Sequence, residues 1–559
     1  MGLKHRPDGL FASTHRAARS CLGVWAAEGV HGEKWPRRGQ FSPDLKADSP
    51  AIGQKAGEKW IGAAALQRTF LLPPRLLAVA AALSLACWVA PAAAQAKLPA
   101  AVSKALVKAQ VPPSAVSLLV LPVEATGATR LSHRAEAAMN PASVMKLVTT
   151  YAALDTLGPQ FTWTTSVLLD GEVANGLLTG NLLIQGGGDP KLVVERLQSM
   201  LGLVQATGAR VVRGDIVLDR SLFQLPPTTA GEFDGEPLRP YNARPDALLI
   251  NFKSLVMTFT PDAAHGRALV RMEPPLAGVM VDDTVPLAVV ARCGDWRSEL
   301  RASIDNPTRV TFQGSYSQAC GERVWPTAYA DPASYAARAV EGSWRLLGGL
   351  MTGQVRDASP AEAALIRTDG SLSGRKPALR FDVPSLPLLD VVRDVNKFSN
   401  NVMAQHLFLT LGLRGARGTA PAGTYEAGQA ALQAWWSKTV PGAVAPAMEN
   451  GSGLSRNERI SAASLAALLR HAAQSRLARD FADSLPTAGV DATMRERAKA
   501  VAGQASIKTG SLRDVAAIAG YAQGASGARY IVIGIINHPN AGAGRAALDA
   551  LIQWAVQEG

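Results

Sequence analysis

Ser143 and Lys146, three positions apart, form the first candidate catalytic pair of the sequence. A serine hydroxyl becomes an effective nucleophile only when a nearby base takes its proton. Residues three apart on a helix share a face, so we expect the Ser143 hydroxyl and the Lys146 amine to lie together. The pair alone carries little information, because Ser-x-x-Lys is expected by chance in a chain of this composition.

Two further motifs follow this pair along the chain. Ser399 and Asn401 form Ser-x-Asn, and Lys508, Thr509 and Gly510 form Lys-Thr-Gly. The order Ser-x-x-Lys, Ser-x-Asn, Lys-Thr-Gly resembles the signature of penicillin-binding proteins and serine β-lactamases. The set predicts an acyl-enzyme mechanism with the first serine as nucleophile and the first lysine as base.

The first two motifs have expected tasks in acyl transfer. Lys146 must be neutral to act as a base, and burial or a second cation such as Lys508 would lower its pKa. Ser399 is expected to relay a proton between Lys146 and the leaving nitrogen. Asn401 is expected to hold the substrate amide.

The third motif is expected to bind the substrate. Lys508 and Thr509 can hold a terminal carboxylate through a charge and a hydroxyl. Gly510 has no Cβ, so its strand can approach the substrate closely. The backbone N–H groups of Ser143 and Ser511 are the expected oxyanion hole.

Ser455 and Asn457 form a second Ser-x-Asn, in the Gly-rich segment NGSGLSRNERIS. We favour Ser399 and Asn401, because Ser399 directly precedes a convincing helix and Lys397 adds positive charge there. Lys397 is interpreted as a solvated or packing lysine, with a substrate contact as the alternative.

Apolar patterning indicates the elements that must position these residues. A buried strand is predicted at 115–123 and a helix at 141–158, with Asn140 as N-cap. Short β-like runs separated by Gly, Pro and Asp fill 161–340. Helices are predicted at 335–350 and after Phe398. The C-terminal part predicts, in order, strands at 505–510, 516–522 and 530–537 and a helix at 545–556.

This order predicts an α+β fold, a transpeptidase/β-lactamase-like antiparallel sheet covered by helices and interrupted by a large β-rich insertion. Residues 97–160 and 341–559 are expected to form the discontinuous catalytic domain, and 161–340 the inserted domain or domains. Residues 1–66 show no sustained periodicity and are interpreted as a non-native or disordered N-terminal extension, the start site having been assigned too early.

Residues 67–96 are predicted to be a signal peptide. An apolar run at 76–94 follows Arg68 and Arg75 and ends in small residues, which is typical of an export signal. An uncleaved membrane anchor is the alternative, since about 20 apolar residues span a bilayer. We expect cleavage, no stable membrane anchor afterwards, and a periplasmic location. The apolar segment 547–556 is interpreted as a core layer, not a membrane helix.

Cysteine use and charge exclude several classes of function. Cys293 and Cys320 follow the predicted signal and suggest a disulfide, with two free buried thiols as the alternative. No Cys or His cluster has metal-ligand spacing, so we predict no metal and no cofactor.

The formal charge is +12, but 45 Lys and Arg and 39 Asp and Glu follow residue 96. This excess of six predicts no nucleic-acid partner, although attraction to an anionic cell wall stays open.

Several segments resemble the D-alanyl-D-alanine carboxypeptidase/endopeptidase family of low-molecular-mass, class C penicillin-binding proteins. They are NPASVMKLVTTYAALDTLG, GNLLIQGGGDP, GDIVLDRSLF, RPYNARPDALLINF, NKFSNNVMAQHLF, NGSGLSR and KTGSLRDVAAIAGY. The resemblance implies cleavage of terminal D-alanine and of D-alanyl-diaminopimelyl cross-links in peptidoglycan stem peptides. It also implies covalent inhibition by β-lactam antibiotics and leaves a homodimer open. Asn450 departs from the family, which usually carries Asp there.

The nearest alternative functions are a β-lactamase or an esterase of the same fold. A deacylating glutamate of the class A β-lactamases cannot be placed, and class C enzymes use Tyr-x-Asn where this chain has Ser399. A Ser-His-Asp hydrolase is disfavoured because no Gly-x-Ser-x-Gly elbow is present. A non-catalytic cell-wall binding protein is disfavoured because all three motifs are intact.

Overall fold

The computed structural model describes residues 97–124, 127–290, 292–414 and 422–558. The expected extension 1–66 and signal peptide 67–96 lie outside the described residues and stay predictions. In the part of the chain that is described, no helix is long and apolar enough to cross a membrane.

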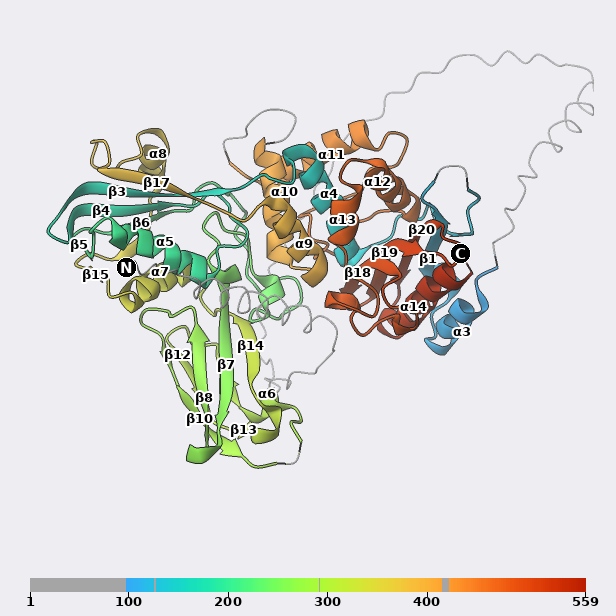
Figure 1. The fold of residues 1–559 in the computed structure, drawn as a ribbon, viewed down its shortest axis with the longest axis horizontal. Coiled ribbons are helices and arrows are strands. Elements are labelled where there is room, and N and C mark those ends of the chain that lie inside the picture. The colour runs from blue at the N-terminus through green and yellow to red at the C-terminus, as the bar shows by residue number, and fades with distance from the viewer. Residues whose placement is uncertain (1–96, 125–126, 291, 415–421, 559) are drawn as a thin grey trace, which may run out of the picture. The chain divides into compact units, whose positions relative to one another are not determined.

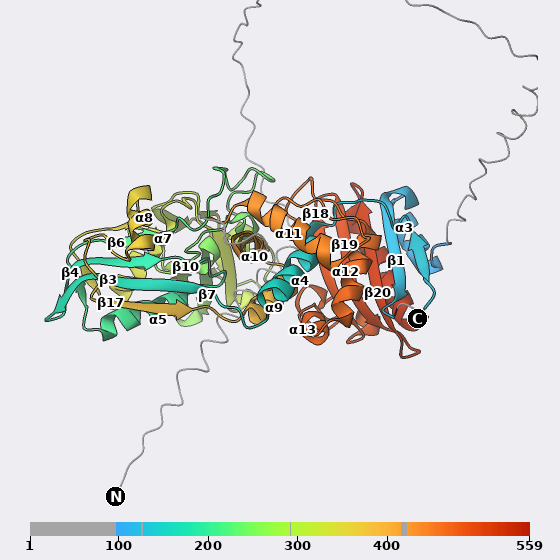
Figure 2. The same cartoon turned by 90° about the horizontal axis from the view of Figure 1, so that it is seen from above.

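One sheet has five antiparallel strands in the order β18-β19-β20-β1-β2. Its strands are β1 (Val116–Pro122), β2 (Leu131–His133), β18 (Ala505–Leu512), β19 (Val515–Gln523) and β20 (Arg529–Asn537). N-terminal β1 therefore pairs with C-terminal β20, and the two lie side by side in blue and red (Figures 1 and 2). This sheet is built from both ends of the described chain.

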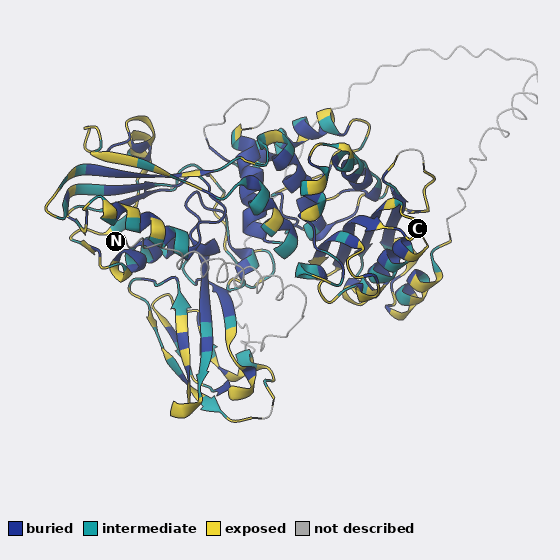
Figure 3. Ribbon diagram, in the orientation of Figure 1, coloured by how far each residue is buried: buried dark blue, intermediate teal, exposed yellow. Residues whose placement is uncertain are grey.

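Side chains alternate between the two faces of this sheet, as the period of two along a strand requires. Leu118 and Val120 of β1 join the core around α3 (Ala100–Lys108) and α14 (Ala541–Gln557). Leu119 and Leu121 point to the opposite face, which carries a larger core. Both faces are covered, and β19 and β20 are almost wholly buried (Figure 3).

Six helices contribute to the larger core on the second face. They are α4 (Lys146–Leu157), α9 (Leu388–Phe398), α10 (Asn401–Arg414), α11 (Tyr425–Thr439), α12 (Ala462–Gln474) and α13 (Ala478–Asp483). The helix expected at 141–158 differs at its start, because a 3-10 turn at Ala142–Met145 precedes the α-helix. The N-cap position belongs to Pro141 and not to Asn140 as expected, although Asn140 Oδ1 accepts a hydrogen bond from the Ala142 amide at the start of the turn.

A second sheet follows α4 in the chain. Its strands are β3 (Thr164–Ala174), β4 (Leu177–Gln185), β5 (Val211–Val212), β6 (Ile216–Asp219), β15 (Leu350–Met351), β16 (Val355–Asp357) and β17 (Leu379–Pro384). Val167 and Leu169 of β3 pack toward α5 (Val194–Ala206) and α7 (Tyr335–Leu346). Leu168 faces the other way, toward α8 (Pro360–Thr368), so helices cover both faces (Figure 1).

The end of the inserted material differs from the boundary expected at residue 340. Strand β17 pairs with β3, with Leu379 opposite Leu169, and Trp344 of α7 lies in the core of the second sheet. Residues 341–384 therefore belong with the insertion and not with the catalytic part. The amphipathic pattern of α7 reveals one apolar face, but not which sheet that face covers.

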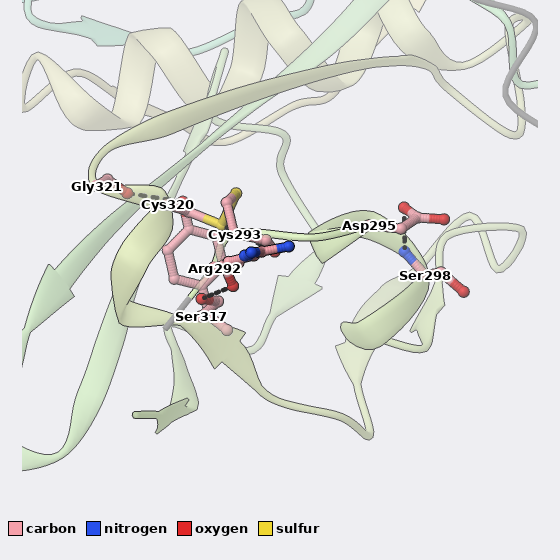
Figure 4. Close-up of a disulfide and its surroundings, with 8 residues drawn as sticks. Arg292, Cys293, Asp295, Ser298, Ser317, Cys320 and Gly321 are labelled. Atoms are coloured by element: carbon pink, nitrogen blue, oxygen red, sulfur yellow. Dashed lines mark hydrogen bonds between the residues drawn. A yellow bond between two sulfur atoms is a disulfide. The ribbon is translucent and has the colours of Figure 1, made fainter. Parts of the chain in front are cut away.

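A third group of strands lies within the insertion. It comprises β7 (Ser254–Asp262), β8 (Arg267–Glu273), β9 (Met280–Val281), β10 (Thr284–Ala288), β11 (Ala302–Ser303), β12 (Arg309–Phe312), β13 (Tyr316–Ser317) and β14 (Arg323–Ala328), with the short helix α6 (Trp296–Glu299). Cys293 and Cys320 form a disulfide here (Figure 4). The Ser317 hydroxyl donates to the Arg292 carbonyl beside it, so the bridge fixes the loop before α6 against β13.

Candidate active site

Ser143 and Lys146 meet at the junction of the 3-10 turn with α4. Lys146 Nζ lies 2.9 Å from Ser143 Oγ, within hydrogen-bonding distance. Ala142 adopts a left-handed backbone conformation with φ 47°, directly before the serine. Ser143 is half-buried and Lys146 is fully buried, so the hydroxyl is reachable while the amine is shielded from water.

The Lys146 amine has two further acceptors, from different segments of the chain. It donates to Asn401 Oδ1 at 2.6 Å and to the Ser452 carbonyl at 2.5 Å. Burial holds the pKa of Lys146 well below its usual value, Lys508 lowers it further, and Glu458 opposes the fall. A lysine with a lowered pKa can be neutral near physiological pH and can take the proton of a serine.

The second motif lies where α9 gives way to α10. Ser399 ends α9 in a left-handed conformation with φ 59°, and Asn401 begins α10. Lys508 Nζ donates to Ser399 Oγ at 2.9 Å and to the Thr509 carbonyl at 2.9 Å. The Ser399 hydroxyl is therefore bonded to the lysine of the third motif, while Asn401 contacts Lys146.

Lys508 itself is fully buried, and burial lowers its pKa to about 7. Its amine is buried and bonded to Ser399 and Thr509, so its charge would attract a ligand through these two residues and not by direct contact. The hydroxyl of Thr509 is hydrogen-bonded to that of Thr493, at 3.0 Å. Ser511 is exposed, and its hydroxyl accepts from Arg545 Nη2 at 3.1 Å.

Gly510 allows strand β18 to lie directly against the turn that carries Ser143. A Cβ on Gly510 would be 2.4 Å from the Pro141 carbonyl oxygen and 3.1 Å from the Ser143 nitrogen. Real Cβ atoms do not approach backbone atoms this closely, so any other residue would push the strand away. The glycine thus brings the third motif to the nucleophile, which places the Ser143 amide beside β18.

The alternative Ser-x-Asn pair is engaged in its own loop. Ser455 Oγ donates to Glu449 Oε2 at 2.5 Å, and Asn457 Nδ2 donates to Glu449 Oε1 at 2.7 Å. Lys397 forms an ion pair of 2.6 Å with Asp491. Ser455 and Asn457 are therefore bonded within their own loop, while the Lys397 amine is paired with a carboxylate.

Two backbone carbonyls complete the site, and sequence reasoning missed both. The Tyr241 carbonyl of the insertion accepts from Asn401 Nδ2 at 3.1 Å, and the Ser452 carbonyl accepts from Lys146. Carbonyls leave no signature in residue types, although the Asn-Gly-Ser-Gly stretch at 450–453 is typical of a tight turn.

Asn450 organises this turn. Its Oδ1 accepts from the amide and the hydroxyl of Ser452, at 2.9 and 2.7 Å. Its Nδ2 donates to the Leu454 carbonyl at 3.0 Å, a contact that an ionised Asp could not make. The amide side chain therefore fits the turn.

No group of three or more His, Cys, Asp and Glu side chains that could hold a metal ion occurs among the described residues. The polar centre of the site consists of two lysines, two serines and one asparagine: Ser143, Lys146, Ser399, Asn401 and Lys508. A hydroxyl bonded to a buried amine suits acyl transfer through a covalent ester.

Comparison with known proteins places this site in a family. The sequence model of the D-Ala-D-Ala carboxypeptidase 3 (S13) family matches residues 98–558. A D-alanyl-D-alanine carboxypeptidase of Actinomadura sp. (strain R39) is 28% identical over 471 residues, which cover 79% of this chain and 81% of that protein.

Solved structures agree on the fold. Penicillin-binding protein 4 of Haemophilus influenzae is 22% identical and has a TM-score of 0.61, with 82% of this chain and 99% of that chain covered. A structure of the same protein complexed with a novel β-lactam has a TM-score of 0.58, at the same identity and coverage.

Proposed function

Because the chain belongs to the D-Ala-D-Ala carboxypeptidase 3 (S13) family, we propose that Ser143 is the nucleophile with which it cleaves D-alanyl-D-alanine peptides. The single observation that carries this role is the 2.9 Å contact between Ser143 Oγ and the buried amine of Lys146. Ser399 Oγ lies equally close, 2.9 Å, to the buried amine of Lys508, and we favour Ser143 because it is the serine of the Ser-x-x-Lys motif.

Acylation begins when neutral Lys146 takes the proton of Ser143 Oγ. The oxygen attacks the carbonyl carbon of the penultimate D-alanine, and the negative charge on the carbonyl oxygen is stabilised by the amides of Ser143 and Ser511. The peptide C–N bond then breaks, and the proton reaches the leaving nitrogen of the terminal D-alanine by way of Ser399. The product is an ester between Ser143 and the shortened peptide.

Deacylation reverses the roles with water in place of the amine. Lys146 takes a proton from a water molecule, the resulting oxygen nucleophile attacks the ester carbon, and the proton returns to Ser143 Oγ. The shortened peptide leaves with a free carboxylate. Asn401 was expected to hold the substrate amide, but its Oδ1 accepts from Lys146 at 2.6 Å and its Nδ2 donates to the Tyr241 carbonyl. In this proposal it therefore positions the base in both steps.

Substrate binding falls to the third motif in this proposal. Thr509 offers a hydroxyl to the terminal carboxylate, and buried Lys508 supplies positive charge behind it. Gly510 keeps β18 close enough for an extended peptide to lie beside it. The same site would accept a cross-linked D-alanyl-diaminopimelyl peptide, which makes the protein an endopeptidase as well, and β-lactams would acylate Ser143.

Location and partners are further parts of the proposal. The predicted signal peptide and the peptidoglycan substrate both point to an exported, periplasmic enzyme that is no longer membrane-anchored after cleavage.

Intact-mass spectrometry of the protein after incubation with penicillin G tests the nucleophile. We expect one added penicilloyl group, mapped by peptide digestion to Ser143. Ser143→Ala should carry none, while the matched control Ser437→Ala, an exposed serine on α11, should keep it. An adduct that persists in Ser143→Ala would contradict the assignment.

Digestion of isolated peptidoglycan tests the substrate. Liquid chromatography with mass spectrometry should show pentapeptides shortened by one D-alanine and cross-linked dimers converted to monomers. If the acylated protein hydrolyses penicillin rapidly and leaves peptidoglycan intact, the β-lactamase alternative holds instead.

A further inference from the structure

Glu458 is a carboxylate buried beneath the active site, and the mechanism above gives it no role. Its residue has no exposed surface. Carboxylates are rarely buried completely unless they are paired or hydrogen-bonded, because removing the charge from water is costly. We therefore expect the Glu458 carboxylate to be stabilised by hydrogen bonds or by a nearby positive charge.

The Glu458 carboxylate is bonded to the loop that carries a ligand of Lys146. Its Oε1 accepts from the amides of Glu449 and Asn450, at 3.0 and 3.1 Å. Two residues further on, the Ser452 carbonyl accepts from Lys146 Nζ. The Gly451 carbonyl between them accepts from Thr149 Oγ1 of α4 at 2.6 Å. The carboxylate thus holds one side of the loop while α4 holds the other.

The second carboxylate oxygen, Oε2, makes no hydrogen bond to any described residue. Burial raises the pKa of Glu458, and the loop amides and Lys146 oppose that rise. The opposite charges of Lys146 and Glu458 act on each other directly, since Glu458 also raises the pKa of Lys146. Lys508 on β18 is the other charged group acting on Lys146, and it has the opposite effect.

We propose that Glu458 is a positioning residue for Lys146: it fixes the loop whose Ser452 carbonyl orients the amine, and it supplies the counter-charge that keeps this amine basic. The proposal rests on the proposed function, in which Lys146 is the base. Burial and Lys508 both weaken the base, and a base that is too weak cannot take the serine proton. Glu458 opposes these two larger effects on the pKa of Lys146.

Glu458→Gln tests the counter-charge, because glutamine keeps an acceptor for the two amides and loses the charge. We expect the acid limb of the pH profile for acylation by penicillin G to move to lower pH, on the order of one unit. The acylation rate on the plateau should fall roughly tenfold, because Lys146 becomes a weaker base. Glu449→Gln is the matched control, since Glu449 bonds to Ser455 and Asn457 and should leave the limb in place.

Each outcome decides the inference. The inference would be overturned if the acid limb of the pH profile for acylation were the same in Glu458→Gln and in the wild type, provided that the circular dichroism of the variant is unchanged. If Glu458→Gln does not fold, Glu458→Asp keeps the charge but draws the carboxylate back from the amides of Glu449 and Asn450. The acylation rate on the plateau should then fall, and a wild-type rate overturns the inference equally. Absence of any acylation in the wild type is a different result, which would overturn the proposed function and this inference with it.

Discussion

Lys508 Nζ donates a 2.9 Å hydrogen bond to Ser399 Oγ, although the two residues are 109 positions apart in the chain. The bond joins strand β18 to the end of helix α9, across the site that holds Ser143. It gives the Ser399 hydroxyl a cationic neighbour that can donate protons, which suits a group expected to pass one to the leaving nitrogen.

The charge of Lys508 predicts a pH dependence of substrate binding. Since burial lowers the pKa of Lys508 to about 7, the amine is protonated below that pH and loses its charge as the pH rises through it. Affinity for a peptide ending in a carboxylate should therefore fall above pH 7, by up to about tenfold per unit. Calorimetric titration of the Ser143→Ala protein measures this without turnover.

The control for this prediction is the same peptide with a C-terminal amide. It carries no charge for Lys508 to attract, so its affinity should change little between pH 6 and 9. If the affinities of the two peptides changed equally with pH, Lys508 would not be the group that attracts the carboxylate.

Lys146→Met removes the base and keeps an unbranched side chain of similar length in the core. The rate of acylation by penicillin G should fall by about 10² to 10⁴-fold, the usual contribution of a general base. Stopped-flow measurement with a fluorescent penicillin follows this rate. Lys438→Met, at an exposed position near the end of α11, is the control and should acylate normally. A Lys146→Met protein that acylates at the wild-type rate would exclude Lys146 as the base.

Gly510→Ala should separate the third motif from the nucleophile. The added methyl group would meet the Pro141 carbonyl oxygen at 2.4 Å, so β18 must shift away from the Ser143 turn. Displacements of this kind cost on the order of 10²-fold in rate. The same acylation assay measures the loss.

Gly542→Ala is the matched control for that substitution. Gly542 lies in α14, and a Cβ there would meet no atom within 4 Å. Alanine also favours a helix over glycine by about 1 kcal/mol, so the control should be as stable as the wild type or more so. An unimpaired Gly510→Ala enzyme would show that close contact between β18 and the turn is not needed.

Removal of the disulfide should weaken the inserted sheet and spare the chemistry. Cys293 and Cys320 are 27 positions apart, and closing a loop of this length stabilises a fold by about 3 kcal/mol in the chain-entropy model. The double variant Cys293→Ser, Cys320→Ser should unfold at lower temperature in a calorimetric scan. Its acylation rate at 25 °C should match the wild type, and a large loss of that rate would tie the bridge to the active site.

The sequence predicted which residues meet in the candidate site, because the three motifs in this order are distinctive as a set although Ser-x-x-Lys alone is not. The α+β fold is confirmed by the neighbouring structures. Lys146 is bonded to Ser143 and Asn401, and Lys508 is bonded to Ser399, so the five residues form two hydrogen-bonded groups. Their order along the chain and their places on a turn, a helix start and a strand could be read from spacing alone.

Other features could not be read from residue types. Lys146 is bonded to the Ser452 carbonyl and Asn401 to the Tyr241 carbonyl, and every residue offers the same carbonyl group. The end of the insertion was placed too early, because the pattern of α7 does not tell which sheet it covers. The left-handed conformations of Ala142 and Ser399 likewise follow from their surroundings, since neither residue type favours them.

The pairing of β1 with β20 sets the order in which the chain can fold. Val116 lies opposite Ile536, so the N-terminal strand has no neighbour on that side until almost the entire chain is available. The insertion, in contrast, pairs only strands that lie between Thr164 and Pro384, and it can form first. Contacts between distant parts of a chain form slowly, so the nucleophile turn reaches its final shape late.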